Sequence, residues 1–161
     1  MSQSQAIPFS RFVTEHSAAV AGFLRGMVAY HDAEECLQET FLAALRAYDS
    51  FDGSNPRAWV LTIARNKAID SERARGRRPD LLAETEQLLA SPPPDEGLDA
   101  EIWLEVAALP EKQRVALVLR YGLDLRYREI GAVLACSEAA ARRSAHEGIS
   151  KLRDRRTEMA R

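Results

Sequence analysis

The sequence predicts an all-α protein built from two small helical domains that are joined by an acidic, proline-rich linker. Apolar residues recur at three- and four-residue spacings along most of the 161-residue chain, and no stretch of useful length alternates between apolar and polar residues. The three successive prolines at positions 92–94 cannot continue a helix and favour an extended spacer. We therefore expect a first domain at residues 8–76, a linker at residues 77–97 and a second domain at residues 98–156.

The first two helices of the first domain are predicted from their apolar stripes. Pro8 suits the opening turn of a helix, and one side of that helix carries Phe9, Phe12, His16, Ala19, Phe23 and Met27. His16 is expected to pack in the core with its apolar neighbours. The second helix should run from about Asp32 to Tyr48, with Asp32 as its N-cap and Glu35 in the capping-box position. Its predicted buried stripe consists of Leu37, Phe41, Leu45 and Tyr48.

A turn-rich loop from Asp49 to Pro56 should lead into a third helix from about Arg57 to Arg75. At about 100° per residue, the apolar face of this helix consists of Val60, Ala64 and Ala68. A second, polar face carries Trp59, Thr62, Asn66, Asp70, Arg73 and Arg77. Trp59 on this face has two interpretations of equal weight. It stacks on an unpaired base beside the arginines, or it packs against the first helix.

The second domain has the pattern of a helix-turn-helix. A helical face formed by Leu98, Ile102, Val106 and Leu109 comes first, and Pro110 then opens a helix that runs to about Tyr121. A short helix from Arg126 to Leu134, a turn at residues 135–137 and a last helix from Glu138 to about Arg156 follow. Ser137 is a suitable N-cap for the last helix. The side chains expected to point inward are Tyr127, Ile130, Leu134, Ala141, Ala145, Ile149 and Leu152.

The net charge of −2 conceals a strong charge pattern. Residues 65–78 and residues 142–156 each contain six basic and two acidic residues, whereas residues 80–105 contain eight acidic residues and no basic one. Such basic surfaces favour contacts with DNA phosphates, with solvated helix ends as the alternative. In the last helix, Arg142, Arg143 and His146 lie opposite the apolar side, where a recognition helix meets DNA. The acidic residues 32–39 suit a basic partner protein or a solvated helix start.

No pattern of catalytic residues occurs in the chain. It lacks a glycine-rich phosphate loop, a nucleophile–histidine pairing and an HExxH motif, so we expect neither an enzyme nor a cofactor. Cys36 and Cys136 form no CxxC pair, and a buried apolar role for both is favoured over a weak metal pairing of Cys36 with His31. The chain shows no apolar run of roughly 18 residues and no signal-peptide pattern. We therefore expect a cytoplasmic protein without membrane insertion.

Two blocks of residues carry a family resemblance. In the first domain, residues 32–41 are DAEECLQETF and residues 57–70 are RAWVLTIARNKAID. In the second domain, the matching positions are Leu109-Pro110, Gln113-Arg114, Leu119-Arg120-Tyr121, Tyr127, Glu129-Ile130 and Ser137-Glu138. Over about residues 9–156 the chain resembles the extracytoplasmic-function (ECF) sigma factors, the small promoter-recognition subunits of bacterial RNA polymerase. The resemblance implies a sigma2-like domain of three to four helices followed by a sigma4-like helix-turn-helix domain.

The resemblance implies that the protein binds core polymerase, through its β and β′ subunits, and promoter DNA, with an anti-sigma factor as a further candidate partner. The residues implied to dock on polymerase are Glu34, Glu35, Gln38, Glu39 and Leu42. Those implied to melt and hold the minus-ten element are Asn55, Arg57, Trp59, Arg65, Asn66, Lys67 and Arg73, with Asn55 contacting a flipped base. Those implied to bind the minus-35 element are Tyr127, Ser137, Arg142, Arg143, His146 and Lys151. The acidic linker would follow the RNA exit path of polymerase.

The chain departs from the family pattern at several positions. Ala139 to Arg143 replace the usual Gly-Thr-Val-Lys-Ser, Ala145 replaces a larger aliphatic residue, and Glu147 stands where a basic residue is common. Cys36 also replaces a usual leucine. Two alternatives are a stand-alone helix-turn-helix regulator and a sigma-like interaction protein without promoter activity. The acidic second helix followed by RAWVLTIARN favours a sigma factor over the regulator, whereas Glu147 and the alanines keep the second alternative open.

Overall fold

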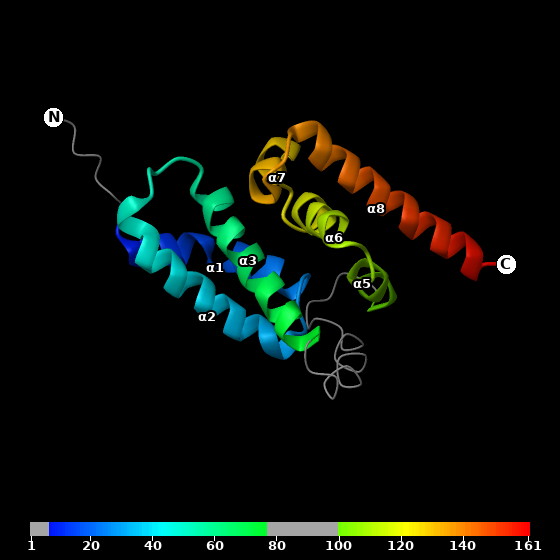
Figure 1. The fold of residues 1–161 in the computed structure, drawn as a ribbon, viewed down its shortest axis with the longest axis horizontal. Helices are drawn as coiled ribbons and strands as arrows, with labels where there is room; N and C mark the ends of the chain where they lie inside the picture. Colours follow the sequence, from blue (N-terminus) through cyan, green and yellow to red (C-terminus); the bar gives the residue numbers. More distant parts are fainter. Residues whose placement is uncertain (1–6, 77–99) are drawn as a thin grey trace.

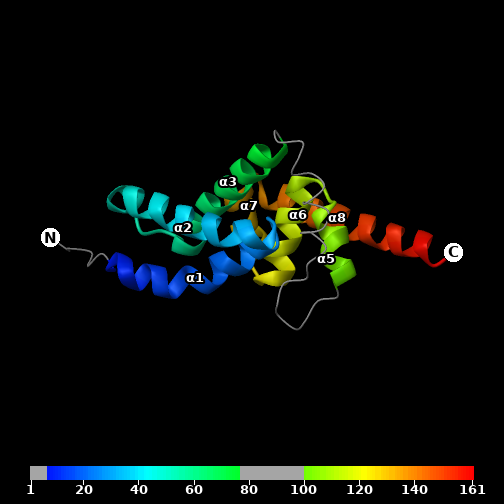
Figure 2. The same ribbon diagram turned by 90° about the horizontal axis from the view of Figure 1, so that it is seen from below.

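The computed structural model describes residues 7–76 and 100–161, and every element in these two ranges is helical. Figures 1 and 2 show α1–α3 gathered on one side of the molecule and α5–α8 on the other. We call these two groups the first and the second domain. The predicted linker, Leu98 and Arg77 lie outside the described residues. The elements are α1 (Phe9–Arg25), α2 (Tyr30–Ala47), the 3₁₀ turn η1 (Tyr48–Ser50), α3 (Pro56–Gly76), α5 (Ala100–Ala107), α6 (Glu111–Leu117), the π-helical turn η3 (Val118–Gly122), α7 (Tyr127–Leu134) and α8 (Glu138–Met159).

The three helices of the first domain pack around one apolar core. Phe23 and Leu24 of α1 and Val60 and Leu61 of α3 are fully buried there. The predicted apolar face of α3 is confirmed, since Val60, Ala64 and Ala68 all have no exposed surface. Small side chains on this face let α3 lie close to its neighbours, α1 and α2. The first domain is therefore a compact support for the outward faces of α2 and α3.

The start of α2 differs from the prediction. The helix begins at Tyr30, and its N-cap is Ala29, whose carbonyl oxygen accepts hydrogen bonds from the backbone N–H groups of Asp32 and Ala33 at 2.9 and 3.1 Å. Asp32 therefore lies inside the first turn, and the predicted capping box with Asp32 as N-cap is wrong. The Asp32 carboxylate instead forms an ion pair with Arg75, near the end of α3, and lies 3.4 Å from His31 Nε2.

The buried side of α2 is displaced from the predicted stripe. The fully or nearly buried residues are Ala33, Cys36, Thr40 and Ala44, which together form a narrow strip of small side chains. Leu37, Phe41 and Tyr48 pack at the edge of the core and are half-buried. The prediction that Leu45 is buried is wrong, because its side chain is 51% exposed. Small residues permit the close contact between α2 and α3, and this rotates the larger apolar residues toward the rim.

The helix-turn-helix of the second domain is present as predicted. In α7, the backbone N–H of the N-cap Arg126 donates to Glu129 Oε2 at 3.0 Å. The turn passes through Ala135, which has φ 54° and ψ 44°, and α8 then begins with Ser137 as its N-cap. The Ser137 hydroxyl accepts from the backbone N–H of Ala140 at 3.1 Å, which confirms the predicted cap. The predicted inner side of α8 is also confirmed: Ala141 and Ala145 are buried, and Ile149 and Leu152 pack against the core.

The two domains contact each other directly. Helix α3 packs against α7, and α1 lies against the η3 turn, so that buried residues of both domains form one continuous core. Figure 1 shows α3 facing α6 and α7 across this contact, while α8 runs away from the first domain. Within the described part of the chain, none of the helices has the length and apolar character that crossing a membrane requires.

Candidate nucleic-acid interface

The outward face of α2 brings the predicted polymerase-docking residues together. Glu34, Glu35, Gln38 and Glu39 are all exposed, and Leu42 is 52% exposed beside them. These five residues follow helical spacing along one side of α2, opposite the strip that packs on α3. Leu45, which was predicted to be buried but is exposed, extends this face by one further turn. An acidic helix face that also exposes two leucines is suited to a protein partner with basic and apolar groups.

The loop between α2 and α3 lies beside an aromatic cluster. Phe9, Phe12, Tyr48, Phe51 and Trp59 form this cluster, and the rings of Phe51 and Trp59 stack with centroids 4.3 Å apart. A hollow of about 600 Å³ opens between the start of α1 and the loop, and its walls include rings of the cluster. The flat aromatic walls suit a planar, unstacked base.

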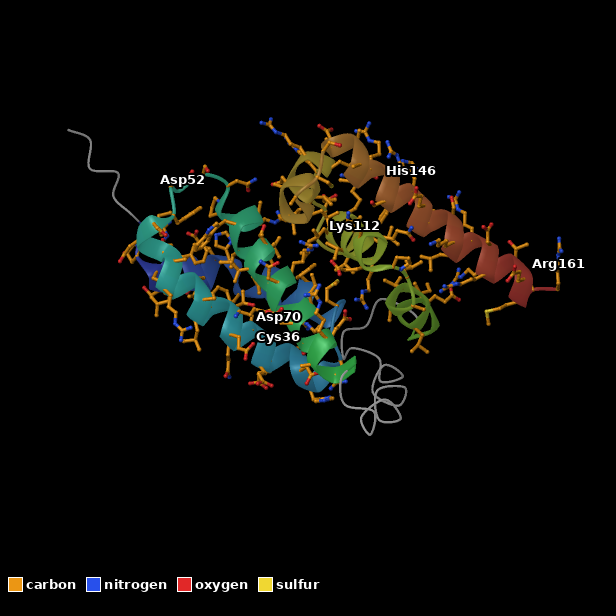
Figure 3. All side chains as sticks on the ribbon, in the orientation of Figure 1. Cys36, Asp52, Asp70, Lys112, His146 and Arg161 are labelled. Atoms are coloured by element: carbon orange, nitrogen blue, oxygen red, sulfur yellow. The ribbon has the colours of Figure 1, made fainter. Side chains whose placement is uncertain are left out.

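The tip of this loop is held by local hydrogen bonds. Ser54 donates from its backbone N–H and its hydroxyl to Asp52 Oδ1 at 2.8 and 2.7 Å, and these bonds lower the pKa of the Asp52 carboxyl. The Asn55 side-chain oxygen accepts from the backbone N–H of Ala58 at 3.3 Å, and Asn55 itself has φ 42°. Asn55 is exposed and acts as the N-cap of α3 through this bond. Asp52 lies at the far edge of the first domain in Figure 3.

Trp59 packs against the first helix, α1, which is one of the two roles predicted for it. Its ring meets that of Phe12 in α1 at 5.7 Å, edge to face, and stacks on Phe51. The side chain is half-buried, so one part of the indole stays accessible at the surface. Trp59 therefore supports the loop through Phe51, and stacking of a base on its remaining surface stays a prediction.

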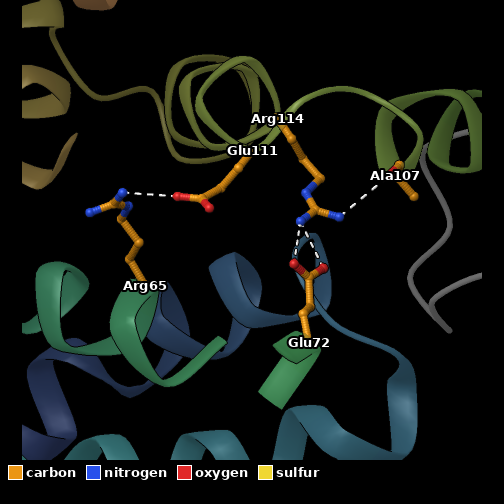
Figure 4. Close-up of polar contacts among 5 residues, drawn as sticks. All are labelled: Arg65, Glu72, Ala107, Glu111 and Arg114. Atoms are coloured by element: carbon orange, nitrogen blue, oxygen red, sulfur yellow. Dashed lines mark hydrogen bonds and ion pairs between the residues drawn. The ribbon is translucent and has the colours of Figure 1, made fainter. Parts of the chain in front are cut away.

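The other predicted minus-ten residues divide into two groups along α3. Asn66 and Arg73 are exposed, and Lys67 is half-buried. Arg57 and Arg65, in contrast, are engaged with the second domain. The Arg57 guanidinium donates to the carbonyl oxygen of Leu123, and Arg65 Nη2 lies 2.9 Å from Glu111 Oε1 (Figure 4). In this arrangement the second domain covers part of the face predicted to hold DNA.

Helix α8 presents the predicted minus-35 residues on one surface. Arg142, Arg143, His146 and Lys151 are all exposed, and Figure 3 shows His146 on the side of α8 that faces away from α6. Ser137 is exposed at the beginning of the helix, where N-terminal residues of a recognition helix meet base edges. Glu147 is exposed as well and accepts a hydrogen bond from Gln113 Nε2 at 3.2 Å.

Tyr127 is placed between two arginines. The guanidinium carbons of Arg120 and Arg142 lie 4.6 and 5.1 Å from the centroid of its ring, within cation–π distance. Arg142 also lies 3.4 Å from Glu138 one helical turn earlier, and Arg120 donates to the carbonyl oxygen of Leu125 at 3.0 Å. Tyr127 therefore gathers two cations at the start of the helix-turn-helix.

Sequence reasoning missed four residues at these surfaces. Arg120 belongs to the Leu119-Arg120-Tyr121 block, but its residue type and spacing predict no contact with Tyr127. Glu72, Glu111 and Arg114 join the two domains, with Arg114 Nη2 lying 2.7 Å from both carboxylate oxygens of Glu72. The only signal in the sequence for Arg114 is its place in the Gln113-Arg114 pair of the family resemblance. Nothing local in the sequence pairs it with a carboxylate 42 residues away.

Both cysteines in the described ranges are free thiols. Cys36 is buried, and burial raises the pKa of its thiol, which donates weakly to the carbonyl oxygen of Lys67 at 3.9 Å. Figure 3 shows Cys36 on α2 near Asp70 of α3. Cys136 is half-buried in the turn between α7 and α8. No group of three histidine, cysteine or acidic side chains within the described residues is arranged to hold a metal ion.

The fold and these surfaces define a class of protein: a two-domain helical protein with a helix-turn-helix, a basic face on α8 and a separate acidic face on α2. Comparison with family models narrows the class. The model of sigma-70 region 2 matches residues 12–78, and that of sigma-70 region 4 matches residues 99–152. Together the two matches cover most of the chain. The chain belongs to the sigma-70 family, and to its ECF group, since it is 36% identical over 140 residues to ECF RNA polymerase sigma factor SigF of Caulobacter vibrioides, covering 84% of this chain and 77% of SigF. It is a transcription initiation factor and not an enzyme.

Known relatives support the same family. RNA polymerase sigma factor CarQ of Myxococcus xanthus is 35% identical over 153 residues, which cover 91% of this chain and 87% of CarQ. ECF RNA polymerase sigma factor SigE of Mycolicibacterium smegmatis is 33% identical over 132 residues, which cover 77% of this chain but about half, 51%, of SigE. The fold matches that of sigma factor RpoE from Bartonella quintana, crystallised with the anti-sigma factor NepR. That match has a TM-score of 0.74 at 23% identity and covers 91% of this chain and 94% of RpoE.

Proposed function

We propose that this protein binds the core of bacterial RNA polymerase and directs it to promoters by opening the minus-ten element and contacting the minus-35 element. The observation that carries the proposal is the separation of two opposite surfaces. The acidic, leucine-bearing face of α2 and the basic face of α8 lie on different domains, so one molecule can bind a protein and a duplex at once. The protein acts in the cytoplasm, where polymerase and promoters are found.

Each surface takes a separate role in this proposal. Core polymerase binds Glu34, Glu35, Gln38, Glu39 and Leu42, with Leu45 as an added apolar contact. The hollow lined by Tyr48 and Phe51 receives an unstacked base of the non-template strand, Asn55 contacts that base, and Trp59 supports Phe51 by stacking on it. Helix α3 holds the rest of the strand through Arg57, Arg65, Asn66, Lys67 and Arg73, and Arg57 and Arg65 reach the strand only when they leave the second domain. The duplex minus-35 element meets Tyr127, Ser137, Arg142, Arg143, His146 and Lys151, and Tyr127 positions Arg142.

An anti-sigma factor is the third proposed partner. The RpoE structure with a similar fold was solved together with the anti-sigma factor NepR. The exposed leucines of α2 would be the natural target of such an inhibitor, because covering them prevents polymerase docking. Co-purification of the tagged protein with polymerase and with any inhibitor, from the same lysate, distinguishes the two partners.

Run-off transcription with purified core polymerase tests the proposed function. Genomic fragments should yield discrete transcripts only when the protein is added, because core polymerase alone does not select promoters. Absence of a protein-dependent transcript from every fragment would contradict the proposal.

The Glu39→Lys variant tests the docking face in the same assay. It places a cation beside Glu34 and Glu35 on α2 and should prevent co-purification with core polymerase. Glu158→Lys makes the same charge change on the exposed end of α8, away from this face, and should co-purify like the wild type. Equal losses in both variants would mean that net charge, and not the face of α2, governs binding.

A further inference from the structure

Two ion pairs connect the domains at the face of α3 that is proposed to hold DNA. Arg65 of α3 pairs with Glu111 of α6 at 2.9 Å, and Glu72 of α3 receives Arg114 of α6 at 2.7 Å on both of its oxygens (Figure 4). Arg114 also donates to the carbonyl oxygen of Ala107 at 3.3 Å. The first domain thus contributes one cation and one anion, and the second domain contributes their complements. We call these two ion pairs the interdomain latch.

Further contacts extend the latch toward the beginning of α3. Arg57 donates to the carbonyl oxygen of Leu123, which follows the η3 turn. The Leu123 side chain lies against α1 at Gly22, where a Cβ atom would be 3.6 Å from Leu123 Cδ2. A methyl group would make only an ordinary contact at this distance, whereas a larger side chain at this position would meet Leu123. Contacts between the domains run from Arg57 to Glu72 and so cover most of the length of α3.

The burial of these groups makes the contact sensitive to each carboxylate. The side chains of Arg114 and Arg65 are 9% and 17% exposed, whereas Glu72 and Glu111 are each 37% exposed. The Nε atoms of Arg57, Arg65 and Arg114 are buried and have no hydrogen-bond partner among the described residues. Unpaired buried donors cost free energy, and a buried arginine that loses its carboxylate costs more. The contact between the two domains therefore depends on two partly exposed carboxylates, those of Glu72 and Glu111.

We infer that the latch is autoinhibitory: it holds the free protein closed and keeps Arg57 and Arg65 from single-stranded DNA. This inference rests on the proposed function, since it assigns the same face of α3 to the melted strand. The Arg65 guanidinium bound to Glu111 is unavailable to a phosphate in the same position, so closure and strand binding compete. The apparent DNA affinity of the free protein is then the affinity of the open form multiplied by the fraction of molecules that are open.

A wedge at Gly22 tests closure without altering any charge. Gly22→Leu places a large side chain against Leu123 and should separate the domains, which small-angle X-ray scattering detects as a larger radius of gyration. Gly22→Ala is the matched control, because a Cβ atom at this position makes only an ordinary contact. The control should therefore keep the wild-type radius of gyration. Far-UV circular dichroism verifies that both variants retain their helices.

Removal of a carboxylate tests the competition. Glu111→Gln releases Arg65 and should increase affinity for a fluorescently labelled single-stranded DNA pool of random sequence by about fivefold. Glu158→Gln makes the same charge change far from the latch. It therefore measures how much affinity is gained simply because the protein carries one negative charge fewer and repels DNA less. Glu72→Gln should act like Glu111→Gln, because it leaves Arg114 buried without its partner.

The combined outcomes decide the inference. Expansion of both Gly22→Leu and Glu111→Gln, together with a gain in DNA affinity over their controls, supports the latch. Wild-type scattering profiles for these variants would overturn it. Expansion without a gain in affinity would overturn the competition for Arg65. A failed run-off assay would count against the proposed function, whereas the scattering profiles report on closure independently of DNA and polymerase.

Discussion

At the scale of single residues, Ala135 adopts a conformation that disfavours alanine. It ends α7 in the left-handed region, with φ 54° and ψ 44°. A Cβ atom costs about 1 kcal/mol in this region, and glycine avoids that cost. Ala135→Gly should therefore raise the free energy of unfolding by about 1 kcal/mol, as measured by chemical denaturation.

The matched control for this prediction is Ala132→Gly. Ala132 is exposed within α7, so glycine there should lower the free energy of unfolding by about 1 kcal/mol. The two variants make the same chemical change three residues apart and should shift stability in opposite directions. Destabilisation by both would show that the turn does not retain this conformation in solution.

Gly131 illustrates a second constraint on the same turn. A Cβ atom at this position would lie 2.8 Å from the carbonyl oxygen of Cys136, and backbone atoms cannot move aside as a flexible side chain can. Gly131→Ala should therefore lower the free energy of unfolding by about 1–3 kcal/mol, even though alanine favours helix. Gly122→Ala is the control, since the nearest atom to its Cβ is 3.9 Å away. Similar denaturation midpoints for the two variants would contradict the proposed close approach.

His16 links residue-scale burial to the pH dependence of stability. Burial lowers the pKa of His16 below its ordinary value of 6.5, Glu15 opposes this shift and Arg57 adds to it. The unfolded chain therefore binds the proton more tightly than the folded chain does. Stability from this residue is fully present above pH 6.5 and is lost as the pH falls toward the folded pKa. His16→Gln should reduce this acid loss in denaturation measurements between pH 7 and pH 5 (a range set by histidine titration). An unchanged pH slope would contradict the assignment.

At the scale of elements, most helices and their buried faces could be predicted because the signals are local. Val60, Ala64 and Ala68 repeat at four-residue spacing, and Ser137 precedes a helix it can cap. The errors arise where competing local signals exist. Asp32 is a good N-cap by residue type, but the carbonyl oxygen of Ala29 starts the helix earlier. Leu45 fits the apolar stripe, but the small residues on α2 set a different buried side.

Helix α8 supports a prediction about the division of labour between the domains. Arg142 is exposed and held near the Tyr127 ring and Glu138, at the end of the helix where base contacts are made. Arg142→Ala should weaken binding to a duplex minus-35 element by about tenfold, as measured by fluorescence anisotropy. Core polymerase binding should be unaffected, because α2 lies on the other domain.

Arg153→Ala provides the control for this prediction, since it removes the same charge from an exposed position three turns further along α8. It should weaken duplex binding by a smaller factor. Loss of core polymerase binding in Arg142→Ala would show that the two surfaces are not independent.

At the scale of the whole molecule, the pairing of the domains could not be predicted from the sequence. Arg65 and Glu111 are 46 residues apart, and Glu72 and Arg114 are 42 apart, so no helical spacing connects them. The charge pattern indicated where cations and anions gather, and the family resemblance assigned Arg65 to DNA. Neither indicates that a carboxylate of the same chain would occupy that arginine. The partner of each charge is determined by how the domains pack, which is a property of the complete fold.

Ionic strength should therefore control the shape of the free protein. Both acidic residues of the latch are partly exposed, so dissolved ions can weaken their attraction to Arg65 and Arg114. The screening length falls from about 10 Å at 0.1 M salt to about 3 Å at 1 M. The radius of gyration from small-angle scattering should rise over this range, with helix content unchanged by circular dichroism. A variant with both Glu72→Gln and Glu111→Gln should be expanded at every salt concentration, because it has no latch to screen. A wild-type radius that is independent of salt would mean that Leu123 and the shared apolar core, and not the ion pairs, hold the domains together.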